Sequence, residues 1–280
     1  MTKSLKWIFH QSQVVLAGHR ALAPHELRLG ASAATYGDGL DLDELRDLQE
    51  IPPPAPQPPV ALVGLVSMRG ADLRGSDLKA AELCGIELEQ CDLRGALLAG
   101  ANLCEAVLVD TRLVGIKATS SRWMEAHLAH CDASDATLAL ASFHRATLME
   151  CNFAAGELEG AVFHRANLHF CRFRTARLSR SVFSSAHLQR CDFHGATLDG
   201  AKFHEAELGG SSFVDCDLQR ADLRSANLRG CAFSGSVLRG ARLQNAQLFG
   251  ADFRGADLRG VRELTPRQIA QARTDSSTLR

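Results

Sequence analysis

Residues 221–230, ADLRSANLRG, contain two copies of one five-residue unit, and this unit fills most of the chain. The third residue of each unit is nearly always leucine or phenylalanine, and the first is small, most often alanine. The register runs from Ala71 to Gly260 without insertion or deletion, which makes 38 consecutive pentads. Self-similarity at a fixed period indicates a solenoid, in which each repeat packs against its neighbours.

A period of five fits neither an amphipathic helix, which needs about 3.6 residues, nor an alternating strand, which needs 2. It fits a coil that turns a corner after every pentad. The small first residue and the large third residue then point inward, and the polar remainder points outward. Glycines such as Gly75, in the last pentad position, would serve the corner.

Several residue types also recur every twenty residues, which predicts four pentads per coil. Cysteines share one inward column, in which Thr111 and Ser211 interrupt the series. Phenylalanines form two columns on opposite sides of the coil. The cysteine column is Cys91, Cys131, Cys151, Cys171, Cys191 and Cys231; the phenylalanine columns are Phe153, Phe173, Phe193, Phe213, Phe233 and Phe253, and Phe143, Phe163, Phe183 and Phe203.

The pattern, seen in ADLRG at 71–75, ANLCE at 101–105 and ADLRG at 256–260, resembles the pentapeptide-repeat family. The resemblance extends over residues 66–260, about two-thirds of the chain. It implies an all-β fold, a right-handed quadrilateral β-helix. With coils stacked at about 4.8 Å, the rod would be roughly 45 Å long.

The flanking sequence divides into four further segments. Residues 1–50 do not repeat and are expected to be partly helical, with leucines at 42, 45 and 48 on one face. The prolines of 51–59 predict an extended linker. Residues 60–70 are expected to cap the first coil. Residues 261–280 should form a C-terminal capping helix and tail.

The C-terminal cap has a recognisable start. Thr265 can serve as the N-cap of a helix with Pro266 at its first position, and Ile269 can cover the last coil. The tail after Asp275 is expected to be loose.

Two inward positions need separate interpretation. Trp123 and Ala133 lie on opposite sides of one coil, so the large ring can fill the space left by the small residue, and we predict that Trp123 points inward. Stacked cysteines could form a metal or redox site, but thiols that replace alanine in a packed interior behave as small hydrophobic groups, which is the reading we favour.

Composition excludes few classes of function. The formal net charge of −1 and a pI near 6.8 give no global reason to expect a nucleic-acid partner. The N-terminus lacks a signal h-region and no apolar run reaches membrane-spanning length, so we expect a cytoplasmic protein without a transmembrane segment. Phosphate-loop, GxSxG, HExxH and CxxC motifs are absent from the sequence, and we expect neither an enzyme nor a cofactor.

Three groups of outward residues are candidate sites. Arginines between 141 and 190 predict a basic zone that could bind an acidic protein surface or phosphate groups: Arg145, Arg165, Arg172, Arg174, Arg177, Arg180 and Arg190. Leu248 and Phe249, expected to be exposed, could form with Ile269 an apolar patch for a homodimer through the C-terminal end. The third group is an outward column with soft ligands, in which we expect ordinary surface rather than a metal site: Cys84, Cys104, Met124, His144, His164, Ser184 and His204.

The leading functional hypothesis is a non-catalytic interaction scaffold or adaptor that presents flat walls to a protein partner. A bacterial effector or a secretion-system accessory protein, docking through the N-terminal segment, is one form of this hypothesis. The resemblance also implies an alternative, a DNA-mimicking protein that protects a topoisomerase. The basic middle of the rod argues against DNA mimicry, which requires a negative surface.

Overall fold

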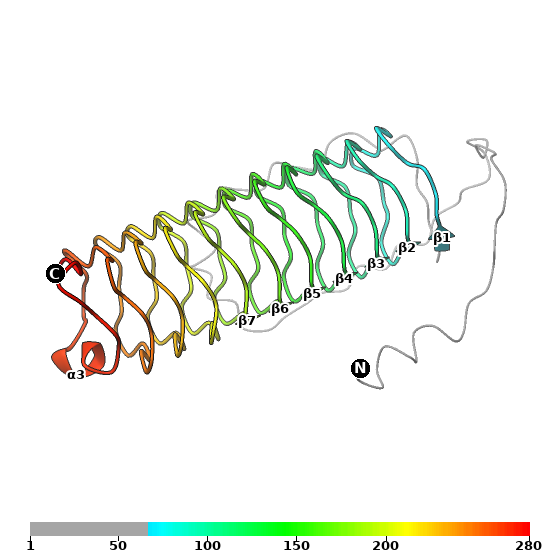
Figure 1. Cartoon of the computed structure of the whole chain (residues 1–280). Helices are drawn as coiled ribbons and strands as arrows, with labels where there is room; N and C mark the ends of the chain where they lie inside the picture. Colours follow the sequence, from blue (N-terminus) through cyan, green and yellow to red (C-terminus); the bar gives the residue numbers. More distant parts are fainter. Residues whose placement is uncertain (1–66) are drawn as a thin grey trace, which may run out of the picture.

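The computed structural model describes residues 67–280, and these form one continuous coil (Figure 1). Residues 1–50 and 51–59, with 60–66 of the predicted cap, lie outside the described residues. One side of the coil carries a parallel sheet in the order β1-β2-β3-β4-β5-β6-β7. Its strands are β1 (Ser67–Arg69), β2 (Glu87–Glu89), β3 (Val107–Val109), β4 (His127–Ala129), β5 (Thr147–Met149), β6 (Asn167–His169) and β7 (His187–Gln189).

The period of twenty residues holds throughout the coil. Within the sheet Ser67 pairs with Glu87, and on the other sides single parallel bridges join residues twenty apart, such as Asp72 to Asp92. We name the four sides by their inward central residues. Each wall consists of pentads twenty residues apart. The first wall begins with the pentad of Leu73, the second with that of Leu78 and the third with that of Leu83. The fourth wall begins with Met68 and contains the sheet β1–β7. The predicted quadrilateral β-helix is confirmed.

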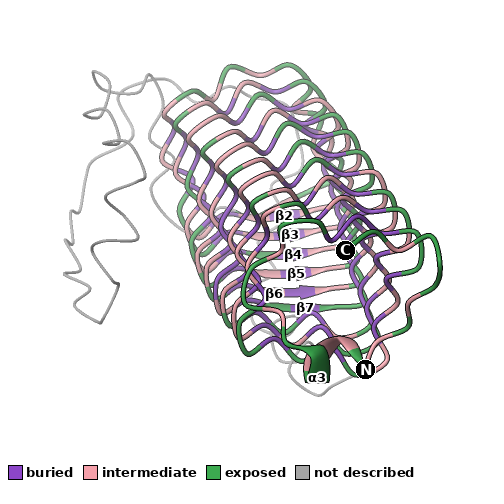
Figure 2. Ribbon diagram, turned by 90° about the vertical axis from the view of Figure 1, so that its left-hand side faces the viewer, coloured by how far each residue is buried: buried purple, intermediate pink, exposed green. Residues whose placement is uncertain are grey.

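Buried residues follow the inside of the coil along its length (Figure 2). The core contains the two predicted phenylalanine columns, flanked by leucines. Rings stack along each column, as in Phe163 on Phe183 at 4.7 Å between centroids. Rings of opposite columns meet edge to face, as in Phe173 and Phe183 at 6.1 Å. Offset stacking and edge-to-face contact are the arrangements that aromatic quadrupoles favour. The third residue of each pentad therefore both fills the interior and locks neighbouring coils together.

Trp123 points inward, as predicted, and is 1% exposed. Its ring stacks on Phe143 at 5.6 Å. The indole Nε1–H donates to Ser121 Oγ at 2.7 Å, which satisfies the polar atom of a buried ring. Ala133 is also buried, so the small residue and the large one share this coil.

The last residue of each pentad from 75 to 260 has a positive φ, which places every corner in the left-handed region. Glycine suits this conformation, yet more of these corners hold another residue than hold glycine. A side chain with a Cβ costs about 1–2 kcal/mol there. Thr175, with a φ of 54°, is the β-branched case and the least suited to such a corner.

Replacing Thr175 by glycine is therefore expected to raise the free energy of unfolding by about 0.5–1 kcal/mol, because relief of the corner strain exceeds the entropy cost of glycine. Thr197 is the matched control, since it is exposed but pairs in extended backbone with Asp217. Thr197→Gly should be destabilising by a similar amount. Urea unfolding measures both variants, and a Thr175→Gly protein that is less stable than the parent would contradict this account of the corners.

The C-terminal end is closed by α3 (Pro266–Ile269), whose N-cap is Thr265, as predicted. Gln268 completes a capping box with Thr265, and its side chain donates to the carbonyl oxygens of Leu243 and Ala246 at 3.0 Å each. The expectation of a loose tail after Asp275 was wrong. Leu279 pairs with Asp257, and Thr278 Oγ1 donates to the carbonyl of Phe253 at 2.9 Å, because the exposed edge of the last coil offers backbone groups that need partners.

Candidate interaction wall

The predicted basic zone does not form one patch. Arg145 and Arg165 lie at the edge of the third wall, Arg172 and Arg174 on the first wall, Arg177 on the second, Arg180 at the corner between the second and third walls, and Arg190 at the corner between the fourth and first. Several are paired: Arg174 with Asp192 at 3.4 Å, Arg177 with Glu159 at 2.6 Å and Arg145 with Glu125 at 3.7 Å. The arginines surround the rod, and neighbouring carboxylates compensate part of their charge.

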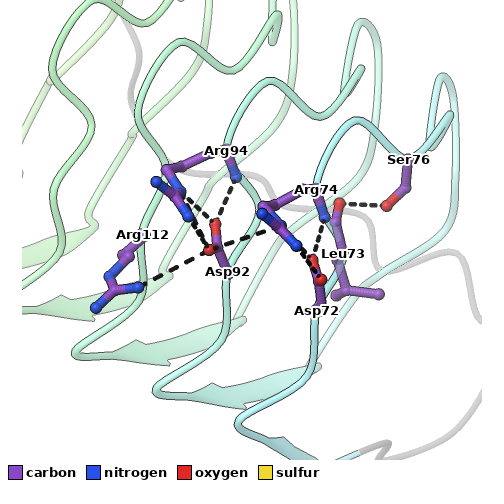
Figure 3. A network of polar contacts seen from close by, with 7 residues as sticks. All are labelled: Asp72, Leu73, Arg74, Ser76, Asp92, Arg94 and Arg112. Carbon is purple, nitrogen blue, oxygen red and sulfur yellow. Dashed lines mark hydrogen bonds and ion pairs between the residues drawn. The ribbon is translucent and has the colours of Figure 1, made fainter.

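The first wall carries a ladder of such pairs near its N-terminal end (Figure 3). Arg74 binds Asp72 through Nε and Nη2 at 2.8 and 2.6 Å. Arg94 binds Asp92 in the same way, at 2.9 and 2.6 Å. Arg112 reaches Asp92 at 3.9 Å from the next coil. The wall is therefore charged but nearly neutral, a solvated surface that does not attract a ligand of either sign.

These pairs predict a loss of stability in acid. Hydrogen bonds from Arg94 and Arg254 lower the pKa of Asp92 and Asp252. Hydrogen bonds from Arg259, and then from Arg239, hold the pKa of Asp257 well below its usual range. Because the folded pKa values are depressed, the stabilisation is present above about pH 4 and is lost as pH falls toward those values.

The melting temperature should therefore be lower at pH 3 than at pH 6, and Asp257→Asn should make this difference smaller. Circular dichroism melts at the two pH values measure both. Equal melting temperatures would contradict the role given to these pairs.

The outward column of the third wall brings His144 and His164 together, with their rings stacked at 5.4 Å. Burial, and then His164, lower the pKa of His144, which disfavours a charged imidazole there. Cys84 is exposed and Cys104 half-buried, and burial raises the pKa of both thiols. His204 lies further along, with Nδ1 at 3.2 Å from the carbonyl oxygen of Arg224. Within residues 67–280, no three His, Cys, Asp or Glu side chains gather as metal ligands.

The inward cysteines are buried, as the small-residue interpretation predicts. Their thiols lie against carbonyl oxygens of the preceding coil, as in Cys131 Sγ at 3.5 Å from the Leu108 carbonyl. Burial raises the pKa of Cys216 and of Cys231 to about 12. A thiol with such a pKa is protonated at neutral pH, and the protonated form is neither a nucleophile nor a metal ligand.

The fourth wall carries two shallow hollows. Gly209 follows Gln189 in one outward column and has no side chain, so a shallow hollow opens between the coils. Gln189, Arg190, Glu207, Gly209 and Asn227 line it. Asn227 Nδ2 donates to Glu207 Oε2 at 2.7 Å, which holds the carboxylate in place. A second shallow hollow lies where this wall meets the C-terminal cap, lined by Arg229, Ala246, Gln247, Phe249, Gln268 and Gln271.

Each hollow has an exposed phenylalanine beside it. Arg190 lies over the ring of Phe170 at 5.8 Å, and Arg229 lies over that of Phe249 at 5.5 Å. Phe170 is 48% exposed and Phe249 63% exposed. An arginine over an aromatic face is held by cation–π attraction, which presents a rigid, partly apolar group at the surface. The fourth wall thus combines apolar anchors, polar groups and shallow relief.

One predicted member of the C-terminal patch was wrong. Leu248 is 0% exposed, because it is the third residue of its pentad and points into the core. Ile269 is half-buried and packs against the core, as expected of a cap residue. Of the three residues, Phe249 alone is strongly exposed, and it belongs to the fourth wall.

Comparison with family models identifies the repeat. The model described as "Pentapeptide repeat region" matches residues 121–203 and 186–263, and that of "Pentapeptide repeats (8 copies)" matches residues 86–122. The chain belongs to the pentapeptide-repeat family. Proteins of this family are generally non-catalytic. A search of curated proteins gave no match, and no helix in residues 67–280 is long and apolar enough to cross a membrane.

Solved pentapeptide-repeat structures include three that are similar to this chain. HetL, involved in heterocyst differentiation regulation in the cyanobacterium Nostoc sp. strain PCC 7120, is 27% identical over 70% of this chain and 90% of its own, with a TM-score of 0.42. A thylakoid-lumen protein of Arabidopsis thaliana is 30% identical over 35% of this chain and 68% of its own, with a TM-score of 0.29. QnrB1, a plasmid-mediated fluoroquinolone resistance protein, is 14% identical over 76% of this chain and 91% of its own, with a TM-score of 0.27. TM-scores below 0.5 say nothing about what this chain binds.

Proposed function

We propose that this pentapeptide-repeat protein is a non-catalytic interaction scaffold and that its fourth wall binds a protein partner. The observation that supports the proposal is that two shallow hollows and two arginine-covered phenylalanines lie along this wall and its edge. Buried aromatic and arginine side chains provide most of the binding energy in protein interfaces. The hollows are shallow and polar, which suits a protein surface better than a small substrate.

The partner should offer an apolar segment flanked by polar groups. Phe170 and Phe249 would bury their exposed faces in it, while Arg190 and Arg229 keep their cation–π contacts. Glu207 and Asn227 provide an acceptor and a donor for backbone amides. Because the strands of each coil already pair with those of the coils before and after them, the wall offers no free strand edge, and recognition depends on side chains.

The N-terminal residues 1–59 are the proposed docking or targeting element, as in an adaptor, a bacterial effector or a secretion-system accessory protein. Their sequence does not repeat and is joined to the rod through prolines. The exposed ring of Phe249 is also a candidate contact for a homodimer through the C-terminal end. Light scattering at high protein concentration tests for this dimer. We expect no gyrase protection, because arginines on all sides of the rod do not reproduce the negative surface of DNA.

The test compares two pairs of exposed apolar side chains. Phe170 and Phe249 belong to the fourth wall and its edge, whereas Met124 and Leu140, which are 37% and 57% exposed, lie elsewhere. A partner is first captured from a native lysate with the full chain and identified by mass spectrometry. The double variant Phe170→Ala with Phe249→Ala should weaken its binding by at least about tenfold, because truncated anchors cost about 2 kcal/mol or more.

Met124→Ala with Leu140→Ala is the control and should leave the affinity unchanged. Calorimetric titration of the purified partner measures both variants. If the control variant loses affinity and the Phe170 and Phe249 variant does not, the partner binds a different wall and the proposal is wrong.

A further inference from the structure

The third wall carries three sulfur side chains in one outward column near its N-terminal end. Cys84, Cys104 and Met124 occupy the same pentad position in three successive coils. All nine cysteines of the chain lie within residues 67–280, and only Cys84 and Cys104 are not buried. Met124 is 37% exposed. The two accessible thiols are therefore neighbours, with a thioether beside them.

The backbone holds these side chains in register. The amide of Gly85 donates to the carbonyl oxygen of Cys104 at 2.8 Å, which joins the coil of Cys84 to the next one. Farther along the same column, the rings of His144 and His164 lie 5.4 Å apart. Side chains one coil apart in this column thus stay parallel and keep roughly the strand spacing of about 4.8 Å.

That spacing decides which bond the two thiols can make. A disulfide requires Cβ atoms about 3.5–4.5 Å apart, which is closer than parallel side chains on stacked coils come to each other. Two metal–thiolate bonds of about 2.3 Å each span about 4.6 Å, which matches the spacing. A single metal ion between the sulfurs therefore needs no movement of the backbone, whereas a disulfide does.

The charges beside the column suit an ion that is held by two thiolates. Arg122 pairs with Glu82 at 3.6 Å, and Asn102 Nδ2 also donates to Glu82 at 2.6 Å. Burial raises the pKa of both thiols, and Arg122 acts against this rise at each sulfur. A monovalent cation bound by two thiolates leaves one net negative charge, which the guanidinium of Arg122 would partly neutralise.

We propose that Cys84 and Cys104 bind a single Cu(I) ion between them, with the thioether of Met124 as a third, weaker ligand. Thiolate and thioether sulfurs are the ligands that select Cu(I). Each thiol releases its proton to solvent when the ion binds. Ordinary surface is the expectation for zinc, which takes four ligands, whereas Cu(I) accepts a linear pair of thiolates. The proposal concerns the third wall and does not depend on the function proposed for the fourth.

Anaerobic titration of the full chain with Cu(I), in competition with the chromophoric chelator bicinchoninate, tests the proposal. The parent should remove one equivalent of Cu(I) from the chelator. Cys84→Ser and Cys104→Ser should each weaken this binding by at least about hundredfold, since loss of a group that merely supports a metal ligand already costs about 10–100-fold. Met124→Leu should weaken it by a smaller factor than either serine variant.

Cys216→Ala is the matched control, because Cys216 is buried and Ala196 holds the equivalent position in the coil before it. This variant should bind Cu(I) as the parent does, and circular dichroism confirms that every variant is folded. As a second measurement, Cu(I) should protect Cys84 and Cys104 together from alkylation by iodoacetamide, which mass spectrometry detects.

Four results would overturn the proposal. The parent fails to compete with the chelator, either serine variant keeps the parental affinity, Cys216→Ala loses as much affinity as the serine variants, or Cu(I) protects one of the two accessible thiols without the other.

Discussion

Phe183→Ala is expected to lower the free energy of unfolding by about 3–5 kcal/mol, the usual cost of truncating a buried aromatic ring. Phe183 is 0% exposed and lies in the middle of its column. Its ring stacks on Phe163 at 4.7 Å and on Phe203 at 5.0 Å. It also meets Phe173 and Phe193 edge to face at 6.1 and 5.9 Å. The substitution removes contacts with two neighbouring coils and with the opposite column.

Urea unfolding followed by circular dichroism measures this effect. In a solenoid the damage can also separate the two halves of the rod, which would appear as a second transition. Phe170→Ala is the control, because the ring of Phe170 is 48% exposed and should contribute within about 0.5 kcal/mol. If Phe183→Ala costs no more than this control, the stacked columns do not hold the coils together.

A double-mutant cycle at Trp123 and Ala133 is expected to show that these two residues share one volume. Trp123→Ala alone should cost about 3–5 kcal/mol. Ala133→Phe alone should cost about 1–3 kcal/mol, because a ring on the first wall would overfill the coil opposite the indole. In the next coils Phe153 meets Phe143 edge to face at 6.1 Å, which shows the position that a ring at 133 would take.

The double variant should recover part of the loss, with an interaction energy of about 0.5–3 kcal/mol in its favour. Denaturant midpoints of the parent, the two single variants and the double variant complete the cycle. Additive losses would mean that Trp123 and Ala133 are packed independently. The volume-sharing interpretation of the irregular pentads would then be wrong.

The sequence was sufficient to predict the core because the inward positions repeat without a break. Each inward column could be written down as residues twenty apart, so the stacking of Phe163 on Phe183 and the burial of Trp123 followed directly. The same rule places Leu248 inward and Phe249 outward. The prediction that Leu248 is exposed was therefore inconsistent with the repeat register. The tail could not be predicted in this way. Leu279 pairs with Asp257 at a spacing of 22 residues, outside the repeat.

The candidate site was harder to predict than the fold. Phe170 with Arg190 and Phe249 with Arg229 obey the twenty-residue spacing, so the outward columns contain this signal, although it is two isolated pairs rather than a continuous column. The hollow beside Glu207 depends on the missing side chain of Gly209, and the relief of a wall follows from side-chain lengths rather than from period. Arginine counts along the chain predicted one basic zone, whereas winding distributes these arginines around the rod.

The central claim is that the fourth wall is the surface that binds a partner. Gln189 on the fourth wall and Gln219 on the second are the same residue type at the same pentad position, so a photo-crosslinking residue at each site compares the two walls. With the captured partner added to the purified full chain, we expect a crosslinked product from position 189 and none from position 219. A product from position 219 with none from position 189 would contradict the account.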